Sequence, residues 1–203
     1  MAEGEKATIG HVITQGIIGA FKVARGNFDG YRHFSNTIDG FWQSFLAAPL
    51  TLPIRVLLLA GTFSLATETL SSNMVFLVET IGFLIDWIVF PLLMIPITRM
   101  MNITNRYVPF IIAYNWTKLP IYLAVSLALF IAMSPGEGAM NPLGGMLVLL
   151  AGGWSFWLRW RVAKDMLEIT GLNAAVIVLF DTGIAIVMSG LIAQMIGPAT
   201  ATG

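Results

Sequence analysis

The chain has 203 residues, of which 57% are hydrophobic and 11% are charged. An ordinary soluble domain carries about a quarter charged residues, so this composition is typical of a protein surrounded by lipid. Eleven basic residues balance eleven acidic ones, which leaves no surplus of positive charge for a nucleic-acid partner. The chain has no Cys and only two His, which excludes disulfides and thiolate chemistry. We therefore expect no metal and no cofactor.

Residues 1–40 precede the hydrophobic segments, and we predict that they form a cytoplasmic, interfacial region. From Ile9 to Ala24, apolar and small residues recur at the three-and-four spacing of one helix face, which predicts an amphipathic helix. Two placements fit this helix equally well. It lies in the headgroup region of the membrane, or its apolar face packs under the bundle that follows.

Five later stretches are each apolar over the roughly 20 residues that a transmembrane helix needs. The connections between them are short, so we expect a single transmembrane domain over residues 41–197 and a short extracytoplasmic tail at 198–203. The predicted fold is therefore all-α, a polytopic membrane bundle of five transmembrane helices preceded by an amphipathic interfacial helix. The predicted spans are 41–66, 74–98, 107–132, 143–163 and 173–196.

Basic residues indicate the orientation, because cytoplasmic loops collect Lys and Arg. Those outside the spans or at their ends fall on one side of the predicted membrane: Lys6, Lys22, Arg25, Arg32, Arg99, Arg106, Arg159, Arg161 and Lys164. This pattern predicts a cytoplasmic N-terminus and an extracytoplasmic C-terminus.

The end of the fourth predicted span combines aromatic and basic residues. Trp154, Trp157 and Trp160 recur at every third position beside Arg159 and Arg161. This spacing resembles a platform for stacking bases, but an aromatic belt next to cytoplasmic arginines accounts for it better. We therefore interpret these five residues as membrane-interface residues.

Ionisable residues also occur within the spans, where they are costly and usually face a partner, a cavity or a pathway. They are Arg55, Glu79, Asp86, Lys118 and Asp181. At about 1.5 Å per residue, four of them lie near the middle of the bilayer and Glu79 lies closer to the outer surface. Because cations and anions lie at similar depths, we predict two ion pairs, Arg55 with Asp86 and Lys118 with Asp181. Such pairs either fix the register of the helices or form a functional site.

The most polar run within a span contains Tyr114, Asn115 and Thr117. Prolines flank this run, and a proline inside a helix frees a backbone carbonyl. If the bundle contains a binding cavity, we expect these three residues to line it. We interpret the glycine pairs that begin at Gly144 and Gly152 as close contacts between helices. No catalytic or nucleotide-binding motif accompanies these groups, so we expect a protein that is not an enzyme.

Three stretches carry a resemblance to a known family. They are FDGYRHFSNTIDGFWQSFLAAP at Phe28 to Pro49, AYNW at Ala113 to Trp116, and RWRVAKDMLEITGLNAAVIVLFD at Arg159 to Asp181. With its five predicted spans, the chain is similar to uncharacterised bacterial membrane proteins of Yip1-like type. The resemblance implies a non-enzymatic five-helix protein of the bacterial cytoplasmic (inner) membrane that works through partners. It implies no site residues.

Three functions fit these features, of which the weakest is a membrane enzyme that acts on lipid and would need a cytoplasm-facing cleft with convergent carboxylates. The first is a membrane-organising or accessory subunit that acts through the lipid bilayer, other membrane-protein subunits or a homo-oligomer. The alternative is a small transporter or an ion- or proton-conducting protein with a charged site at the membrane midplane. The first function needs only paired charges in a packed interior, whereas the alternative requires a polar cavity within the bundle.

Overall fold

The computed structural model describes residues 8–63, 72–133 and 141–196, apart from the side chains of residues 58–63, 72–76, 79, 193, 195 and 196. In this part of the chain every element is helical, which confirms the predicted all-α fold. The elements are α1 (Ile9–Ala24), η1 (Phe28–His33), α2 (Ile38–Ser44), α3 (Ala47–Phe63), α4 (Ser72–Met100), η2 (Thr104–Arg106), α5 (Tyr107–Ala132), α6 (Pro142–Leu167) and α7 (Gly171–Ile196).

Three stretches of the described helices are long and apolar enough to cross a membrane. They are Thr80–Met100, Thr104–Ala132 and Gly171–Ile192, and they coincide with the second, third and fifth predicted spans. Helix α6 is as long as α5, but its Gly, Ser and Trp residues, two arginines, a lysine and an aspartate make it less apolar. Helix α3 has 17 residues in the described part of the chain. The described helices thus include three of the five predicted spans.

The first predicted span, 41–66, does not begin as one continuous helix. Helix α2 ends at Ser44, and α3 begins three residues later at Ala47. Pro49 lies in the first turn of α3, where a missing backbone N–H costs no helical hydrogen bond. The proline therefore favours the start of a new helix at this point, and an apolar run alone does not reveal such a break.

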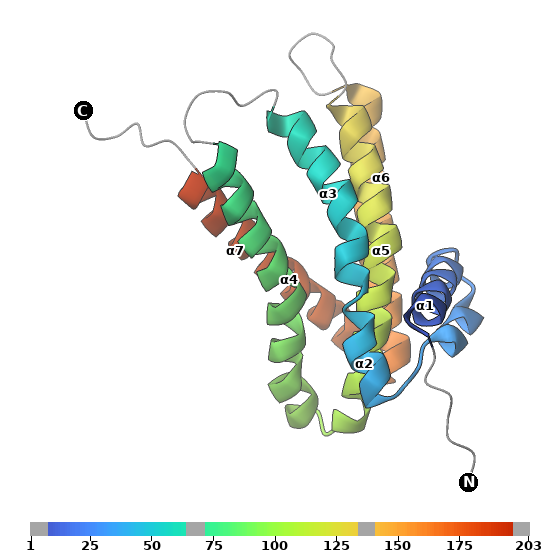
Figure 1. The fold of residues 1–203 in the computed structure, drawn as a ribbon. Helices are drawn as coiled ribbons and strands as arrows, with labels where there is room; N and C mark the ends of the chain where they lie inside the picture. Colours follow the sequence, from blue (N-terminus) through green and yellow to red (C-terminus); the bar gives the residue numbers. More distant parts are fainter. Residues whose placement is uncertain (1–7, 64–71, 134–140, 197–203) are drawn as a thin grey trace.

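The long helices form two groups (Figure 1). Helices α5 and α6 run antiparallel side by side, and α3 packs against α5; we call these the α3–α5–α6 group. Helices α4 and α7 pack against each other and form the α4–α7 pair. The pair joins the group through contacts of α4 with α5 and of α7 with α6. Figure 1 shows the pair leaning away from the group toward the upper end of the bundle.

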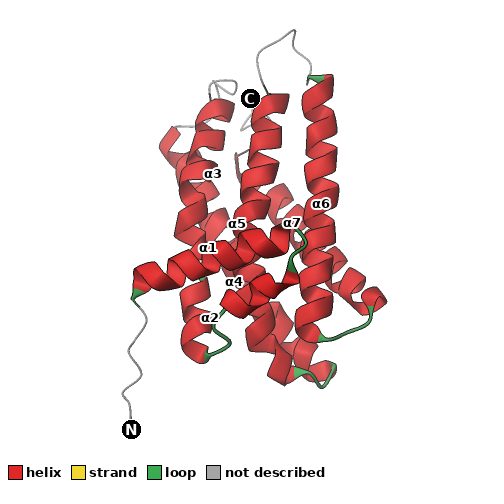
Figure 2. Cartoon of the chain, turned by 90° about the vertical axis from the view of Figure 1, so that its right-hand side faces the viewer, coloured by secondary structure: helices red, strands yellow, loops and turns green. Residues whose placement is uncertain are grey.

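Helix α1 lies across the outside of the bundle, at a steep angle to the long helices (Figure 2). It packs against α5 and η1. At Gly16, a Cβ would overlap the ring of Trp116 on α5, so only glycine allows this close approach. Small residues of the amphipathic helix therefore pack on the bundle, and a place for this helix in the headgroup region stays a prediction. Ile9 and Ile18 remain exposed.

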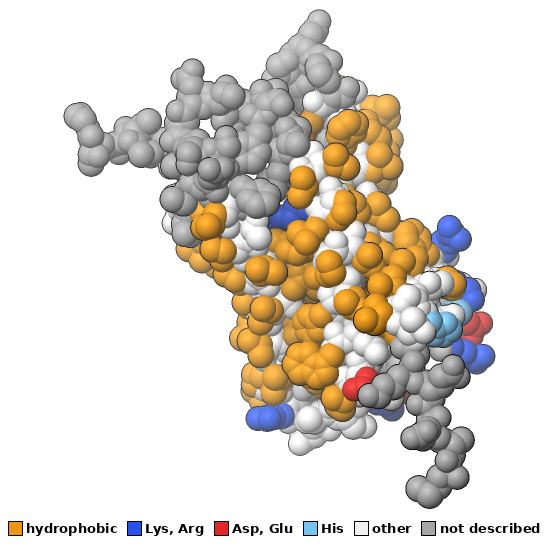
Figure 3. All heavy atoms as spheres, viewed as in Figure 1, with side chains coloured by type: hydrophobic (Ala, Val, Ile, Leu, Met, Phe, Trp, Pro, Cys, Tyr) orange, Lys and Arg blue, Asp and Glu red, His pale blue; other side chains and the backbone are white. Residues whose placement is uncertain are grey.

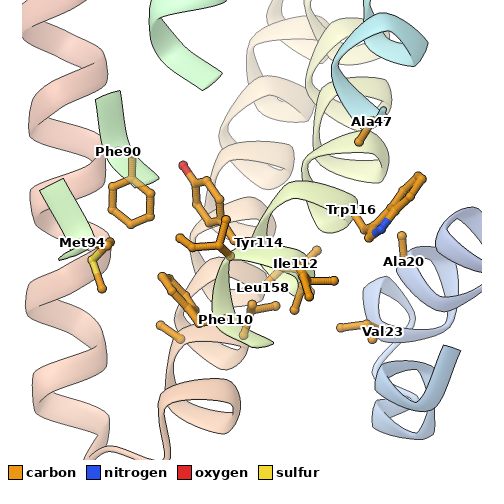
Figure 4. Close-up of a cluster of buried hydrophobic side chains, with 14 of the residues drawn as sticks. Ala20, Val23, Ala47, Phe90, Met94, Phe110, Ile112, Tyr114, Trp116 and Leu158 are labelled. Carbon is orange, nitrogen blue, oxygen red and sulfur yellow. The ribbon is translucent and has the colours of Figure 1, made fainter. Parts of the chain in front are cut away.

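Helix α5 is the centre of the core. Every residue from Phe110 to Pro120 is buried, so this segment has neighbours on all sides. Figure 4 shows Phe90 and Met94 of α4 on one side of α5 and Val23 of α1 on the other. A charged side chain on this part of α5 consequently has to find its partners inside the protein.

The outer surface is consistent with a lipid environment. Figure 3 shows hydrophobic side chains over the middle of one face, with Lys and Arg near its lower and right-hand edges. Large apolar residues of α4 and α7 that point outward include Leu84, Ile88, Leu92, Val176, Leu179 and Ile186. A soluble monomer rarely exposes a continuous apolar patch of this kind.

The glycines of α6 allow a matched test of this packing. A Cβ at Gly144 would overlap the backbone of Ala132 on α5, whereas a Cβ at Gly152 meets no described atom within 4 Å. We expect Gly144→Ala to destabilise the protein by about 1–3 kcal/mol through overpacking. Thermal unfolding in detergent should therefore show a lower Tm for this variant.

Gly152→Ala is the control, because alanine favours a helix and nothing opposes it at this position. Its Tm should be unchanged or higher. Equal losses for the two variants would contradict the described crossing of α5 and α6. The same geometry corrects the interpretation of the glycine pair at Gly152, which makes no close contact with the described residues.

Candidate functional site

Asp86 lies at the middle of α4, about 21 Å from either end at 1.5 Å per residue. The Lys118 Nζ atom on α5 lies 3.2 Å from Oδ2 of this carboxylate and 3.2 Å from the backbone carbonyl oxygen of Asp86. Tyr122, one turn further along α5, donates a hydrogen bond of 3.2 Å to the same Oδ2 atom. Two side chains from one face of α5 therefore hold the carboxylate of α4.

Aromatic rings complete the surroundings of Lys118. Its ammonium lies 4.5 Å from the ring centroid of Trp87 and 4.9 Å from that of Tyr114. A cation over an aromatic face is stabilised by about 2 kcal/mol when both are desolvated. Only 7% of Lys118 is exposed, so the carboxylate, the carbonyl and the two rings largely replace water around its charge.

A proline shapes α4 at this level. Pro91 has no backbone N–H, so the carbonyl of Trp87, four residues earlier, loses its helical hydrogen bond. Figure 1 shows α4 changing direction along its length. The Tyr107 hydroxyl donates to the Pro91 carbonyl at 3.1 Å. Side chains of α5 thus donate to two backbone carbonyls of α4 on either side of the one that Pro91 frees, those of Asp86 and Pro91.

A second ion pair joins α6 and α7. The Arg159 Nη1 atom lies 3.1 Å from Oδ2 of Asp181, and the Tyr114 hydroxyl donates to Oδ1 of the same carboxylate at 2.7 Å. The other terminal nitrogen of Arg159, Nη2, donates to the Ser155 hydroxyl at 3.3 Å. Both carboxylate oxygens of Asp181 consequently have a donor, as a buried anion requires.

The two ion pairs line one cavity of about 210 Å³. A water molecule occupies about 30 Å³ in the liquid, so the cavity has room for several waters or a small solute. The Asp86 side chain keeps 36% of its surface exposed although it lies at mid-helix. The lining residues are Asp86, Tyr114, Lys118, Ile121, Tyr122, Val125, Arg159, Asp181 and Ala185.

Charges of opposite sign face each other across this cavity. Both carboxylates, Asp86 and Asp181, belong to the α4–α7 pair. The two cations belong to α5 and α6, and α5 also supplies the phenols of Tyr114 and Tyr122. Electrostatic attraction thus holds the α4–α7 pair against the α3–α5–α6 group at the level of the cavity.

Both ion pairs predicted from depth are wrong in their partners. Asp86 pairs with Lys118, and Asp181 pairs with Arg159. Depth along a span gives the height of a charge but not the direction in which its helix faces. The prediction also placed Arg159 at the membrane interface because it ended the fourth span at residue 163. Helix α6 continues to Leu167, so Arg159 lies about 12 Å from its end.

Of the remaining predicted charges, Arg55 does not line the cavity, although its positive charge lies close enough to act on Tyr122, which does. The guanidinium of Arg55, on α3, lies 5.5 Å from the ring centroid of Phe83 on α4. The side chain of Glu79 lies outside the described residues. Asp86, Lys118 and Asp181 are therefore the members of the predicted charged site that line the cavity.

Of the three polar residues on α5 expected to line a cavity, one does so and two have other hydrogen-bond partners. Tyr114 lines the cavity. Asn115 instead donates to the Ser44 hydroxyl of α2 at 2.9 Å. The Thr117 hydroxyl donates to the backbone carbonyl of Ala113 within its own helix. Successive residues of a helix point in different directions, so one polar run does not present all its side chains to one cavity.

The aromatic and basic residues near the end of α6 attach other elements to the bundle. Trp154 is partly buried against the core. The Trp160 indole N–H donates to the Gly171 carbonyl of α7 at 2.8 Å. Trp157 lies near Phe28 of η1, with 6.4 Å between their ring centroids. These contacts hold η1 and the start of α7 against α6.

Arg161 and Tyr31 form part of the same attachment. Arg161 lies 4.2 Å above the Phe28 ring, and its Nε atom is 2.8 Å from Oδ2 of Asp165. The Tyr31 hydroxyl lies 3.4 Å from the same carboxylate oxygen. Burial raises the pKa of Tyr31, and the negative charge of Asp165 raises this pKa further. Tyr31 therefore remains a neutral donor at physiological pH.

The ion pair between Arg159 and Asp181 can be tested by stability. Arg159→Met leaves the buried carboxylate with Tyr114 as a donor but without a counter-ion. Loss of one partner of a buried pair typically costs about 3–5 kcal/mol. We expect the double variant Arg159→Met/Asp181→Asn to regain at least half of that loss, because the uncompensated charge is gone. Unfolding in detergent measures both variants.

Arg161→Met is the control, because its partner Asp165 lies in a more exposed pair. A partly exposed pair contributes about 1 kcal/mol or less, so this loss should be small. A double variant no more stable than Arg159→Met alone would show that Arg159 and Asp181 are not coupled.

Comparisons with family models, with curated proteins and with solved structures find no match to this chain. The resemblance to Yip1-like membrane proteins therefore stays a prediction. The features that bear on function are the charged cavity and the helices around it, three of which are long and apolar enough to cross a membrane.

Proposed function

We propose that this chain is a small transporter or ion-conducting membrane protein whose solute site is the charged cavity between the α4–α7 pair and the α3–α5–α6 group. The observation that carries this proposal is that both ion pairs line a single cavity of about 210 Å³. Ionisable side chains at bilayer depth are costly, and those that face a cavity usually serve a pathway. Purely structural pairs would be enclosed by packing, whereas Asp86 is 36% exposed.

The division of charge between the helix groups supports a transport mechanism. Carboxylates on α4 and α7 face cations on α5 and α6, so a charged solute or a proton that neutralises one partner weakens the attraction across the cavity. Many transporters work by rocking one helix bundle against another around a site near the midplane. In this chain the α4–α7 pair would move, and the cavity between the groups would be the fixed site.

We also propose that α3 and α6 cross the membrane, which gives the chain five transmembrane helices. Helix α6 has 26 residues and is about 39 Å long at 1.5 Å per residue, enough to cross a bilayer. Outward-facing apolar residues support a place in the membrane for both α6 and α3; they are Leu143, Met146, Leu149 and Leu150 on α6 and Leu52, Val56 and Leu57 on α3. With five spans, the distribution of Lys and Arg favours a cytoplasmic N-terminus in a bacterial inner membrane.

An accessory or membrane-organising subunit is the second candidate. The exposed apolar side chains of Ile9, Ile38 and Trp42 favour it, because they lie near the basic end of the bundle and suit a lipid surface or a partner subunit. This function predicts that the purified chain moves no solute by itself. It also predicts a stoichiometric partner in native mass spectrometry.

Transport is testable in liposomes that contain the purified protein and a pH-sensitive dye. We impose a membrane potential and, separately, gradients of small organic cations, and expect the wild type to dissipate them faster than empty liposomes. Asp86→Asn and Asp181→Asn should each lower this rate at least about tenfold, because each removes a cavity carboxylate, and a barrier higher by about 1.4 kcal/mol suffices.

The matched control is Asp165→Asn, which removes a carboxylate that lies outside the cavity and pairs with Arg161 on its own helix. Its rate should stay within about twofold of the wild type, a barrier difference below 1 kcal/mol. A wild-type rate equal to that of empty liposomes, or an Asp86→Asn rate equal to the wild type, would refute the transport function.

A further inference from the structure

We propose that the cavity contains a binding site for a small primary ammonium ion and that Lys118 occupies this site as a tethered stand-in for the free ligand. The site, which we call the ammonium box, consists of the carboxylate and backbone carbonyl of Asp86 and the rings of Trp87 and Tyr114. The inference rests on the proposed function, because it names the class of solute that the cavity takes.

The ammonium box has the chemistry of an amine receptor. It offers two oxygen acceptors, each 3.2 Å from the Lys118 nitrogen. Its two aromatic faces lie 4.5 and 4.9 Å from the same nitrogen. A carboxylate combined with aromatic faces is the arrangement that proteins use to bind organic ammonium ions. The two acceptors require N–H donors, so a primary ammonium fits the box better than a quaternary one.

The cavity beside the ammonium box suits the rest of such a molecule. Ile121, Val125 and Ala185 provide an apolar wall for a short alkyl chain. Tyr122, whose hydroxyl contacts the Asp86 carboxylate at 3.2 Å, lines the same cavity. A volume of about 210 Å³ accommodates a small alkylamine together with water.

Charge balance makes Lys118 a competitor of the ligand. The Asp86 carboxylate is the anion of the box, and the second carboxylate of the cavity, Asp181, already holds Arg159 and Tyr114. Two ammonium ions in the box would leave one positive charge uncompensated at low dielectric, which is costly. Entry of an amine therefore requires the Lys118 ammonium to leave the box for water in the open part of the cavity, where its charge is hydrated, and its flexible four-carbon stem allows this movement.

Binding to the purified full-length protein tests this inference, with ethylammonium as the probe and isothermal titration calorimetry and thermal shift as readouts. We expect wild type to bind ethylammonium weakly, because Lys118 competes. Lys118→Ala should bind it at least about tenfold more tightly, a difference of about 1.4 kcal/mol. Asp86→Asn should abolish binding. Tetramethylammonium and ethanol should bind at least about tenfold more weakly than ethylammonium, again about 1.4 kcal/mol or more.

The matched control is Lys164→Ala. The Lys164 ammonium also lies over a tryptophan ring, 5.3 Å from the centroid of Trp160, but outside the cavity. This variant should bind ethylammonium as the wild type does. If Lys118→Ala does not fold, the comparison of wild type with Asp86→Asn still decides the outcome.

Three results would overturn the inference. The first is that the wild type does not bind ethylammonium, even if Lys118→Ala does, because Lys118 would then be a permanent occupant. The second is that Asp86→Asn binds as tightly as wild type. The third is that tetramethylammonium binds as well as ethylammonium. The transport function fails separately: amine binding without flux in liposomes would refute transport alone, and proton flux without amine binding would refute the ammonium box alone.

Discussion

Neutralisation of buried charge is the constraint on which this structure depends. Four ionisable side chains from four helices lie near the middle of the bundle, where each is wholly or partly buried. Each carboxylate therefore has a cation from a neighbouring helix and a tyrosine hydroxyl. These requirements fix how α4 and α7 are rotated, because Asp86 must face Lys118 while Asp181 faces Arg159. The hydrophobic surfaces of the helices are too uniform to specify those rotations alone.

The same interactions distinguish this bundle from a simply packed one. Among the described residues that line the cavity, the anions lie on the α4–α7 pair and the cations lie on α5 and α6. An interface built in this way is strong while both charges of each pair are present and weakens when one of them is neutralised. A proton or an organic cation in the cavity can therefore change how tightly the two helix groups associate, which links occupancy of the site to movement of the helices.

The sequence predicts the helical fold and several long helices correctly for a simple reason. Three apolar runs of sufficient length have one low-energy solution in lipid, because a helix satisfies every backbone hydrogen bond internally. The points at which one helix ends and the next begins are harder to predict. The break between Ser44 and Ala47, which lies within an apolar run, illustrates this. Helix α3 ends at Phe63 in the described part of the chain, and residues 64–66 of the predicted first span lie outside it, so that span remains a prediction.

The candidate site is only partly predictable for a geometric reason. Its members Asp86, Lys118 and Asp181 are found from their depth, since charge in lipid is rare. Their partners are not, because the direction of a side chain around its helix depends on tertiary packing. Arg159 is missed because the apolar run ends before α6 does, so a half-buried arginine that lines the cavity resembles an interfacial one. A carboxylate at mid-helix without a matching cation on its own helix could have pointed to such a partner.

The central claim is that a water-accessible charged cavity lies inside the membrane bundle. Cysteine accessibility in sealed vesicles measures it directly, because the chain has no native Cys. Val125 lines the cavity, whereas Leu127, on the same helix, is 62% exposed on the outer surface. A charged, membrane-impermeant methanethiosulfonate reagent should modify Val125→Cys and leave Leu127→Cys, which faces lipid, unmodified. Rapid modification of Leu127→Cys with none of Val125→Cys would contradict the account.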